Sequence, residues 1–385
     1  WFIRSGKKPV SHSYQIAFII EQTLGHITHA KNLQALVSQD LMVQAAWGLP
    51  SWESRGIESW LPLARSNWTL RAGLQARRIL GELNRQARPE ALFFHTQVPA
   101  VLSQDWLRRI PSVVSLDATP RQYDTLGEFY AHSQGPVWLE RWKCRLNREC
   151  FRFARHLVTW SEWAKNGLIE EYEVPPEKIT VIPPGVDAQA WTPNEAQRQH
   201  NGRVKILFVG GDFQRKGGYV LLDAFRSLRQ RLPDRVDLEL HLVTRDPIPE
   251  EPGVFVHRRL QPNSAQLKQL YFDSHIFCLP TSGDCLPMAL SEAGAAGLPL
   301  VSTRLAAIPE IVRDGETGLL VPMGDTGALA GALQRLVADP ELRIHLGQSA
   351  SRLVEQRYDA RKNTARLLEI LKMTADEGRA RRRPE

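Results

Sequence analysis

The segment between Val204 and Arg231 constrains the fold of this chain more than any other. An apolar, β-branched run of strand length, VKILFV (204–209), leads into a loop bracketed by glycines, GGDFQRKGG (210–218), and then into a helix-patterned stretch, 219–231. This order predicts a strand, a loop and a helix, the repeating unit of an α/β domain. Because the loop matches neither G-x-G-x-x-G nor the Walker pattern, dinucleotide dehydrogenases and P-loop NTPases are disfavoured.

The charges of this loop are suited to an anion. Exposed amides of the loop and the positive end of the helix dipole favour negative charge, and Arg215 and Lys216 add two cations there. These features predict a diphosphate site. The alternative, which the loop alone leaves open, is that both side chains are solvated charges in a β-to-α turn.

Acidic residues in the same half of the chain complement the two cations of the loop. A short apolar strand ends at Leu279, a polar turn carries Asp284, and Glu292 lies inside a helix-patterned segment, 286–296. A loop carboxylate and a second one further along the helix can meet one extended ligand at two points. Carboxylates suit the hydroxyls of a sugar, whereas Arg and Lys suit a diphosphate. The basic loop and the two acids together therefore predict a nucleotide-sugar site. In the alternatives, Asp284 is a helix N-cap and Glu292 faces solvent.

Four segments in a fixed order resemble the retaining glycosyltransferases of family 4 (glycosyl transferases group 1). They are VTWSEWAKNGLIEEYEVPPEKITVIPPGVD (158–187), ILFVGGDFQRKGG (206–218), AQLKQLYFDSHIFCLPTSGD (265–284) and LSEAGAAGLPLVSTRLAAIPEIVRDGETGLLVP (290–322). The resemblance covers nearly the whole chain. It implies an α/β protein of the GT-B fold, in which two Rossmann-like, doubly wound domains face each other across a cleft.

The resemblance also implies a domain organisation. Residues 1–187 would form the acceptor-side domain, 188–357 the nucleotide-sugar-binding domain, and 358–375 a C-terminal helix that crosses back to the first domain. The linker is expected at 183–193, where prolines and a glycine break regular structure. Residues 376–385 are charged and poor in apolar side chains, so a frayed tail is predicted.

The resemblance also implies roles for individual residues that stand at matching positions of the family pattern. The resemblance implies that Arg215 and Lys216 hold the donor diphosphate and neutralise charge as the nucleoside diphosphate leaves. Asp284 would contact the transferred sugar, and Glu292 would bind the ribose hydroxyls. The same resemblance implies a mechanism in which the departing phosphate helps take the acceptor proton, so the protein positions groups and stabilises charge, and no nucleophile is named.

The backbone between the two acids would hydrogen-bond the sugar at Leu286 and Met288. Two departures from the family pattern fall here. Asp284 is one methylene shorter than the usual Glu, and Pro287 replaces a usual glycine and removes an amide. Both departures leave the identity of the donor sugar open.

Polar residues also follow predicted strands of the N-terminal half. After the strand QIAFII (15–20), the resemblance places Gly25 where the backbone approaches the donor phosphate, and a plain turn is the alternative. The segments 91–97 and 113–120 predict two more strand ends at the cleft. Asp117 stands where many relatives have a His that contacts the donor sugar, but Asp does not titrate near neutral pH. Asp117 is predicted to orient the sugar or the acceptor hydroxyl, or else to cap the turn before Thr119-Pro120.

Three histidines near these strand ends are interpreted as structural. His26 and His29 lie at the start of a predicted helix, and His95 lies at a strand end. We expect packing or helix-start roles for them, with His95 as the alternative polar group to Asp117 at the cleft.

The resemblance predicts an enzyme whose co-substrate is a nucleotide-sugar donor and whose acceptor is an unknown polysaccharide, glycolipid or small glycoside. The acids are not in D-x-D form and no His or Cys cluster has ligand spacing, so neither a metal nor another cofactor is expected. Two other functions stay open, namely an epimerase or phosphorylase on the same fold and a catalytically silent sugar-nucleotide-binding protein.

Charge and cysteine usage bear on partners and compartment. The net charge of +7 is spread over both halves, which disfavours nucleic acid as a partner. The four cysteines form no C-x-x-C pair, and no apolar run of spanning length or signal peptide is expected, so a cytoplasmic setting is predicted.

One helix-patterned stretch suggests contact with an anionic membrane. Its basic and apolar residues recur at helical spacing: Arg141, Arg145, Arg148, Arg152 and Arg155, and Trp138, Trp142, Leu146 and Phe153. The prediction is peripheral docking at the inner face of a membrane. The alternative is a helix packed on its sheet with a solvated arginine face.

Overall fold

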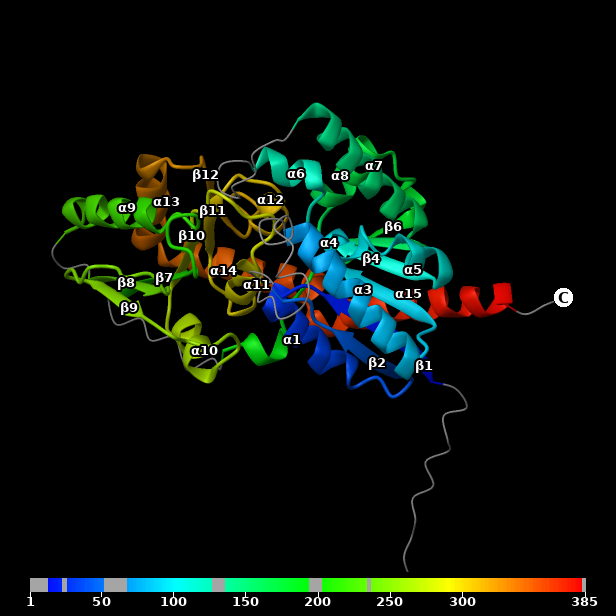
Figure 1. The fold of residues 1–385 in the computed structure, drawn as a ribbon. Coiled ribbons are helices and arrows are strands. Elements are labelled where there is room, and N and C mark those ends of the chain that lie inside the picture. Colours follow the sequence, from blue (N-terminus) through cyan, green and yellow to red (C-terminus); the bar gives the residue numbers. More distant parts are fainter. Residues whose placement is uncertain are drawn as a thin grey trace, which may run out of the picture.

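A computed structural model describes residues 13–22, 26–51, 68–126, 136–193, 203–233 and 237–382 of the chain. Two six-stranded sheets, one in each half of the chain, form the two lobes that are visible in Figure 1. The paired strands are parallel in both sheets. The predicted α/β class with two doubly wound domains is confirmed.

The N-terminal domain is built on the sheet with strand order β2-β1-β3-β4-β5-β6. Its elements are β1 (Tyr14–Ile20), α1 (His26–Val37), β2 (Val43–Gly48), α3 (Trp68–Gln86), β3 (Ala91–His95), α4 (Gln97–Ala100), α5 (Gln104–Arg109), β4 (Ser112–Leu116), α6 (Pro120–Thr125), α7 (Val137–Phe153), β5 (His156–Thr159), α8 (Glu162–Tyr172) and β6 (Ile179–Val181).

The C-terminal domain is built on the sheet with strand order β12-β11-β10-β7-β8-β9. Its elements are β7 (Arg203–Val209), α9 (Gly218–Arg231), β8 (Asp237–Val243), β9 (Val254–His257), α10 (Ala265–Phe272), β10 (Ile276–Leu279), α11 (Met288–Ala295), β11 (Leu300–Thr303), α12 (Ile308–Ile311), β12 (Gly318–Val321), α13 (Thr326–Ala338) and α14 (Pro340–Arg357). The strand, loop and helix predicted over 204–231 are confirmed as β7 and α9.

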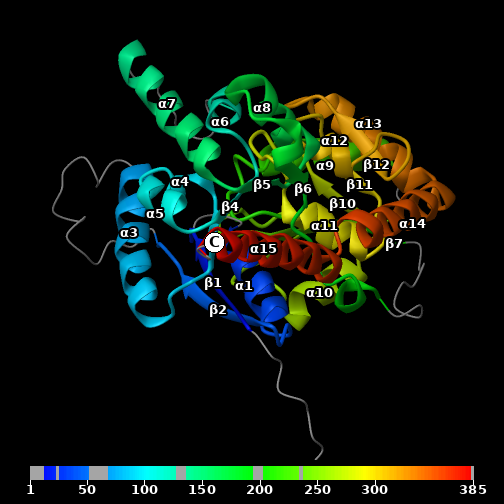
Figure 2. The same cartoon turned by 90° about the vertical axis from the view of Figure 1, so that its right-hand side faces the viewer.

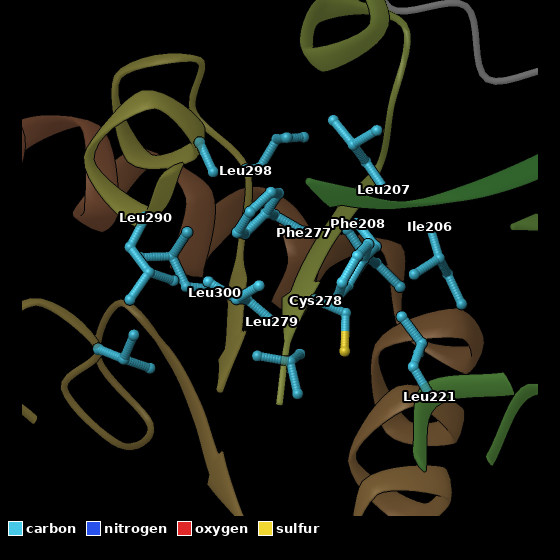
Figure 3. Close-up of a cluster of buried hydrophobic side chains, with 14 of the residues drawn as sticks. Ile206, Leu207, Phe208, Leu221, Phe277, Cys278, Leu279, Leu290, Leu298 and Leu300 are labelled. Atoms are coloured by element: carbon cyan, nitrogen blue, oxygen red, sulfur yellow. The ribbon is translucent and has the colours of Figure 1, made fainter. Parts of the chain in front are cut away.

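Central strands of each sheet are apolar without alternation because helices cover both of their faces. In the C-terminal domain, β7 and β10 lie side by side and place Phe208 and Phe277 in one buried cluster with Leu221 of α9 and Leu290 of α11 (Figure 3). This core holds the ends of β7 and β10 in fixed relative positions.

Each sheet has a topological switch point, which is the place between two adjacent strands from which the strand order continues outward in opposite directions. The switch lies between β1 and β3 in the N-terminal domain and between β7 and β10 in the C-terminal domain. In open α/β sheets, ligands bind outside the carboxyl ends of the strands at such points. Arg215 and Lys216 follow β7 and Asp284 follows β10, whereas Asp117 follows β4, next to β3 in the N-terminal sheet.

The last helix, α15 (Ala360–Arg382), belongs to the C-terminal end of the chain but packs on the N-terminal domain. It contacts α1 and β3, and its long red ribbon crosses the domain in Figure 2. Asn363 Nδ2 donates to the carbonyl of Pro183 at 3.0 Å, which ties the helix to the linker.

The prediction of a frayed tail from residue 376 is wrong over 376–382, where α15 continues. Charged side chains in this part bind partners far away in the sequence. Asp376 accepts a hydrogen bond from the Tyr14 hydroxyl at 3.0 Å, and Arg379 Nη2 lies 2.6 Å from Glu90. These contacts replace the apolar residues whose scarcity suggested disorder.

Polar contacts join the two domains. Asn263 Nδ2 donates to Asn32 Oδ1 of α1 at 2.9 Å. Glu310 of α12 accepts the first amides of α8, from Glu162 at 3.0 Å and Trp163 at 2.9 Å. A carboxylate at a helix N-terminus stabilises its unpaired amides, so these contacts hold α12 of one domain against α8 of the other.

Candidate functional site

The loop between β7 and α9 packs directly on the turn that follows β10. Gly217 has φ of +78°, and a Cβ added there would lie 1.9 Å from the carbonyl oxygen of Pro280. Only glycine combines that backbone conformation with so close an approach. Gly217 is also the N-cap residue of α9, so this helix has no side-chain cap, although the amide of its first residue, Gly218, donates to the carbonyl of Phe213 at 2.7 Å.

This packing brings the predicted cations onto the first predicted acid. Lys216 Nζ lies 2.6 and 2.8 Å from the two carboxylate oxygens of Asp284, and Arg215 Nη1 lies 3.2 Å from one of them. Arg215 also donates to the carbonyl of Gly283, and Thr281 Oγ1 donates to Asp284 at 2.7 Å. Two cations and one carboxylate thus share one place beside the N-terminus of α9.

Two of the alternatives for these residues are wrong. Arg215 is only 9% exposed, so it is not a solvated charge of a turn. Asp284 does not cap α11, because the N-cap residue of that helix is Pro287. The roles in donor binding that the resemblance implies stay predictions.

Glu292 is buried within α11 and accepts a hydrogen bond from the Tyr271 hydroxyl of α10 at 2.7 Å. The alternative of a solvent-facing carboxylate is therefore wrong. Burial raises the pKa of Glu292 to about 7, although the Tyr271 hydroxyl opposes the shift. In the described part of the chain, no hydrogen bond or ion pair joins Glu292 to the Arg215, Lys216 and Asp284 cluster.

The backbone positions that would hydrogen-bond the sugar lie between the two acids. Leu286 is buried in the turn, and Met288 is the first residue of α11, one position after Pro287. Gly25 lies outside the described residues, so its predicted phosphate contact stays a prediction.

In the N-terminal domain, Asp117 follows β4 and belongs to a buried ionic cluster. Its Oδ2 accepts a hydrogen bond from the Tyr123 hydroxyl at 2.5 Å and lies 3.6 Å from His26 Nε2. On its other side, His26 Nδ1 lies 3.1 Å from Glu21 Oε1. Asp117 as a turn cap is wrong, because Thr119 supplies the side-chain cap of α6.

His26 is the buried first residue of α1, as predicted, and it lies between two acids. Burial opposes its protonation, but the bonds and charges of Asp117 and Glu21 outweigh burial and raise the pKa of His26 to about 10. Burial lowers the pKa of His29 to about 3 and that of His95 well below its usual value. At neutral pH the cluster therefore holds one imidazolium between two carboxylates.

The clusters of the two domains meet at Cys285. This buried residue packs with Ala118 and against Tyr123 of the N-terminal domain. Burial, together with the charges of Asp117 and Asp284, raises the pKa of the Cys285 thiol well above its usual value. The acids of both domains therefore face a common region.

Two family models match consecutive parts of the chain. "Glycosyltransferase Family 4" matches residues 40–190, and "Glycosyl transferases group 1" matches residues 203–339. The chain belongs to the family 4 glycosyltransferases. The models meet at the linker, so each domain of this family 4 protein is matched by its own model.

Curated relatives match over part of their length. A D-inositol 3-phosphate glycosyltransferase of Corynebacterium glutamicum (strain R) is 30% identical over 205 residues, which cover 48% of this chain and 49% of the relative. An MMP alpha-(1->4)-mannosyltransferase of Mycolicibacterium hassiacum is 31% identical over 209 residues, 51% of this chain and 48% of the relative. The chain thus spans about half the length of the curated relatives it matches.

Solved structures share the fold over nearly the whole chain. Sucrose-phosphate synthase from Thermosynechococcus elongatus superposes with a TM-score of 0.74 at 14% identity, covering 94% of this chain and 98% of the other. Anabaena Alr3699/HepE in complex with UDP-glucose gives 0.67 at 15% identity, covering 93% and 99%. At such identities the likeness establishes the GT-B fold alone.

Proposed function

We propose that the protein is a retaining glycosyltransferase that moves a sugar from a nucleoside-diphosphate sugar to a hydroxyl of an acceptor. The observation that carries the proposal is the contact of Arg215 and Lys216 with Asp284 beside the open N-terminus of α9. Two cations and a helix N-terminus without a side-chain cap suit a diphosphate, and an adjacent carboxylate suits a sugar hydroxyl. Family membership supports the reaction class.

In this proposal, charge stabilisation is the main contribution of the protein. A diphosphate that approaches Lys216 competes with Asp284 for the ammonium, which frees the carboxylate for a hydroxyl of the transferred sugar. As the sugar leaves, negative charge grows on the diphosphate, and Arg215, Lys216 and the amides of α9 stabilise it without reorganising. The diphosphate helps take the acceptor proton, and no residue of the protein becomes covalently bound to the sugar.

Uridine diphosphate sugars are the first donors to test, because UDP and UDP-glucose are bound in structures of HepE that share this fold. Thermal unfolding with uridine, guanosine and adenosine diphosphate sugars would identify the donor, since a ligand that binds only the folded state raises the Tm. NMR of the product would then establish the configuration of the new bond. Sugar phosphate formed without an acceptor would favour an epimerase or phosphorylase, and binding without turnover would favour a silent binding protein.

Glu292 makes donor affinity depend on pH. Hydroxyls of the ribose that donate to Glu292 stabilise its anion, so binding lowers a pKa that is about 7 in the free protein. Affinity for an intact nucleotide sugar should therefore rise roughly tenfold as the pH increases through 7, with proton release measurable by calorimetry. Each phosphorus of an intact nucleotide sugar carries one ester bond and the shared anhydride bridge, so its one acidic group is already ionised and does not titrate in this range.

Matched variants isolate this effect. Glu292→Gln should abolish the pH dependence, and Tyr271→Phe should move its midpoint upward because the Tyr271 hydroxyl lowers the pKa of Glu292. Equal affinity of the unmodified protein on both sides of pH 7 would contradict the ribose assignment.

We also propose that α7 docks on an anionic membrane. Trp138 and Trp142 are 69% and 50% exposed, whereas Leu146 and Phe153 pack against the core. Arginine side chains beside the two tryptophans add positive charge, and α7 projects from the N-terminal domain in Figure 2. Among the described residues, no helix has the length and apolar character needed to cross a bilayer.

Vesicle sedimentation tests the docking surface. The protein should bind vesicles that contain anionic lipid at low salt and dissociate as salt rises, because each basic residue near such a surface contributes about 1 kcal/mol. Joint replacement of Trp138 and Trp142 by Ser should abolish binding, whereas Ile344→Ser, at another exposed apolar position, should not. Binding that is insensitive to both salt and the tryptophans would rule the surface out. With the reduced cysteines, docking would place the enzyme at the cytoplasmic face.

A further inference from the structure

The carboxylate of Glu292 depends on α10 for its orientation. Its Oε2 accepts a hydrogen bond from the Tyr271 hydroxyl at 2.7 Å, and the charge of Lys268, on the same helix, also favours the ionised carboxylate. Tyr271 and Glu292 are both buried. The place of the carboxylate is therefore fixed by whatever fixes the side chains of α10.

Trp191 contacts both of these side chains of α10. Its ring lies edge-to-face against Tyr271, with centroids 5.1 Å apart and an interplanar angle of 89°. The ammonium of Lys268 lies over the same ring, 5.4 Å from the centroid. Both geometries are favourable, the first for two aromatic rings and the second for a cation on a ring. Phe277 of β10 stacks on Tyr271 at 5.6 Å, so one ring of the sheet and one of the linker fix Tyr271.

Trp191 belongs to the linker, which is itself held by the start of α15. The indole ends a short 3-10 helix, Gln189–Trp191, and is only 2% exposed. The carbonyl of Asp187 accepts the amide of Trp191 at 3.1 Å, and the Asp187 carboxylate lies 2.6 Å from Arg361 of α15. The indole therefore joins the connection between the two domains to the helix that orients Glu292.

We propose that Trp191 is a positioning residue for the nucleoside of the donor, because it fixes Tyr271 and, through Tyr271, holds Glu292 in place for the ribose hydroxyls. The inference rests on the proposed function, in which Glu292 binds the ribose. A flexible apolar side chain would fill much of the same space, but it would not fix the Tyr271 ring. Positioning thus separates from packing in the choice of substitution.

Nucleotides with and without ribose hydroxyls test the inference. Calorimetry with the full chain at about pH 8, where Glu292 is ionised, compares UDP, GDP and ADP, each with its 2′,3′-dideoxy form. The base that the unmodified protein binds is used thereafter. The unmodified protein should bind the ribonucleotide about 10- to 100-fold more tightly than the dideoxy form, the value of hydrogen bonds to a charged group. Because both forms carry the same diphosphate, this ribose preference reports the ribose contact alone.

Matched variants separate positioning from packing. In Trp191→Met the ribose preference should fall about 3- to 10-fold, since a displaced carboxylate keeps only part of a charge-assisted contact. Trp191→Phe keeps an aromatic ring against Tyr271 and should retain the preference within about twofold. Phe225→Leu replaces another fully buried ring of the same core, on α9, and should lower stability without changing the preference.

A double-mutant cycle identifies the route from Trp191 to Glu292. Tyr271→Phe removes the hydroxyl that holds Glu292, so adding Trp191→Met to it should lower the ribose preference little further. Fully additive losses, or an unchanged preference in folded Trp191→Met, would overturn the inference.

Fluorine NMR supplies a readout that leaves the fold intact. With 5-fluorotryptophan in the chain, the resonance of Trp191 is identified by its absence in Trp191→Phe. It should shift more when the ribonucleotide binds than when the dideoxy form binds, because the first engages Glu292. Equal shifts at saturation would refute the inference even if Trp191→Met did not fold.

Failure of the proposed function is recognised separately. If the unmodified protein bound none of the nucleotides, the proposed function itself would fail. If it bound a nucleotide without preferring ribose, the assignment of Glu292 and this inference would fail together, while the diphosphate site would stand. A ribose preference that survived in folded Trp191→Met would refute only the role of Trp191.

Discussion

Replacing Lys216 by Ala should weaken nucleoside diphosphate binding about 10- to 100-fold, the value of a charge-assisted hydrogen bond of roughly 1.5–3 kcal/mol. The loss in kcat/KM should be larger, about 100- to 1,000-fold, because the charge on the diphosphate grows as the sugar leaves. Lys216 is the cleaner test of the two cations. Arg215 also holds the carbonyl of Gly283 and the carboxylate of Asp212, so Arg215→Ala should additionally loosen the turn. Calorimetry with the diphosphate and steady-state kinetics measure the two effects.

A control must separate a lost phosphate contact from the general loss of an ion pair. Arg226 of α9 also binds two carboxylates, Asp223 and Glu251, but it is half exposed and lies on the helix beyond the loop. Arg226→Ala should leave nucleotide affinity unchanged, since exposed ion pairs contribute little. Unaltered affinity in both Lys216→Ala and Arg215→Ala would remove the diphosphate assignment and, with it, the main support for the proposed function.

The elements that the sequence predicts well are those encoded by local patterns. Over 204–231, the apolar run, the glycines and the helical periodicity together specify β7, its loop and α9. The position of Asp284 against Lys216 also follows from topology, because the loops after β7 and β10 meet at a switch point of the sheet. The buried states of Arg215 and Glu292 were not predictable, since their partners come from other elements.

Long-range pairing explains why the prediction of a frayed tail was wrong and why the surroundings of His26 were not predicted. The charged residues at 376–382 suggest a frayed tail when read alone, but α15 places Arg379 against Glu90. His26 has the pattern of a helix-start residue, and nothing near it indicates that Asp117, on another strand end, lies 3.6 Å away. Ion pairs between residues that are distant in the sequence leave no periodic pattern. The local sequence therefore predicts the helix or strand that carries a charged residue, but not the groups that surround it.

Gly217→Ala should be the most damaging single substitution in the donor loop. The added Cβ would lie 1.9 Å from the Pro280 carbonyl oxygen, which belongs to backbone and cannot rotate away, and φ of +78° is strained for alanine. We expect a loss of about 3 kcal/mol or more in the free energy of unfolding, measured by denaturant titration. In the fraction that folds, the loop must move away from the turn after β10, so Lys216 loses Asp284 and nucleotide affinity falls as well.

Gly211 in the same loop provides the matched control. A Cβ at Gly211 would meet no atom within 4 Å, and this glycine is exposed, so Gly211→Ala should change stability by less than about 0.5 kcal/mol. The contrast tests the geometry of the site independently of its chemistry, since stability needs no knowledge of the donor. If both alanine variants were equally stable, the close packing of the loop on Pro280 would be wrong. The contact between Lys216 and Asp284 would then lose its structural basis, because that packing is what brings the two side chains together.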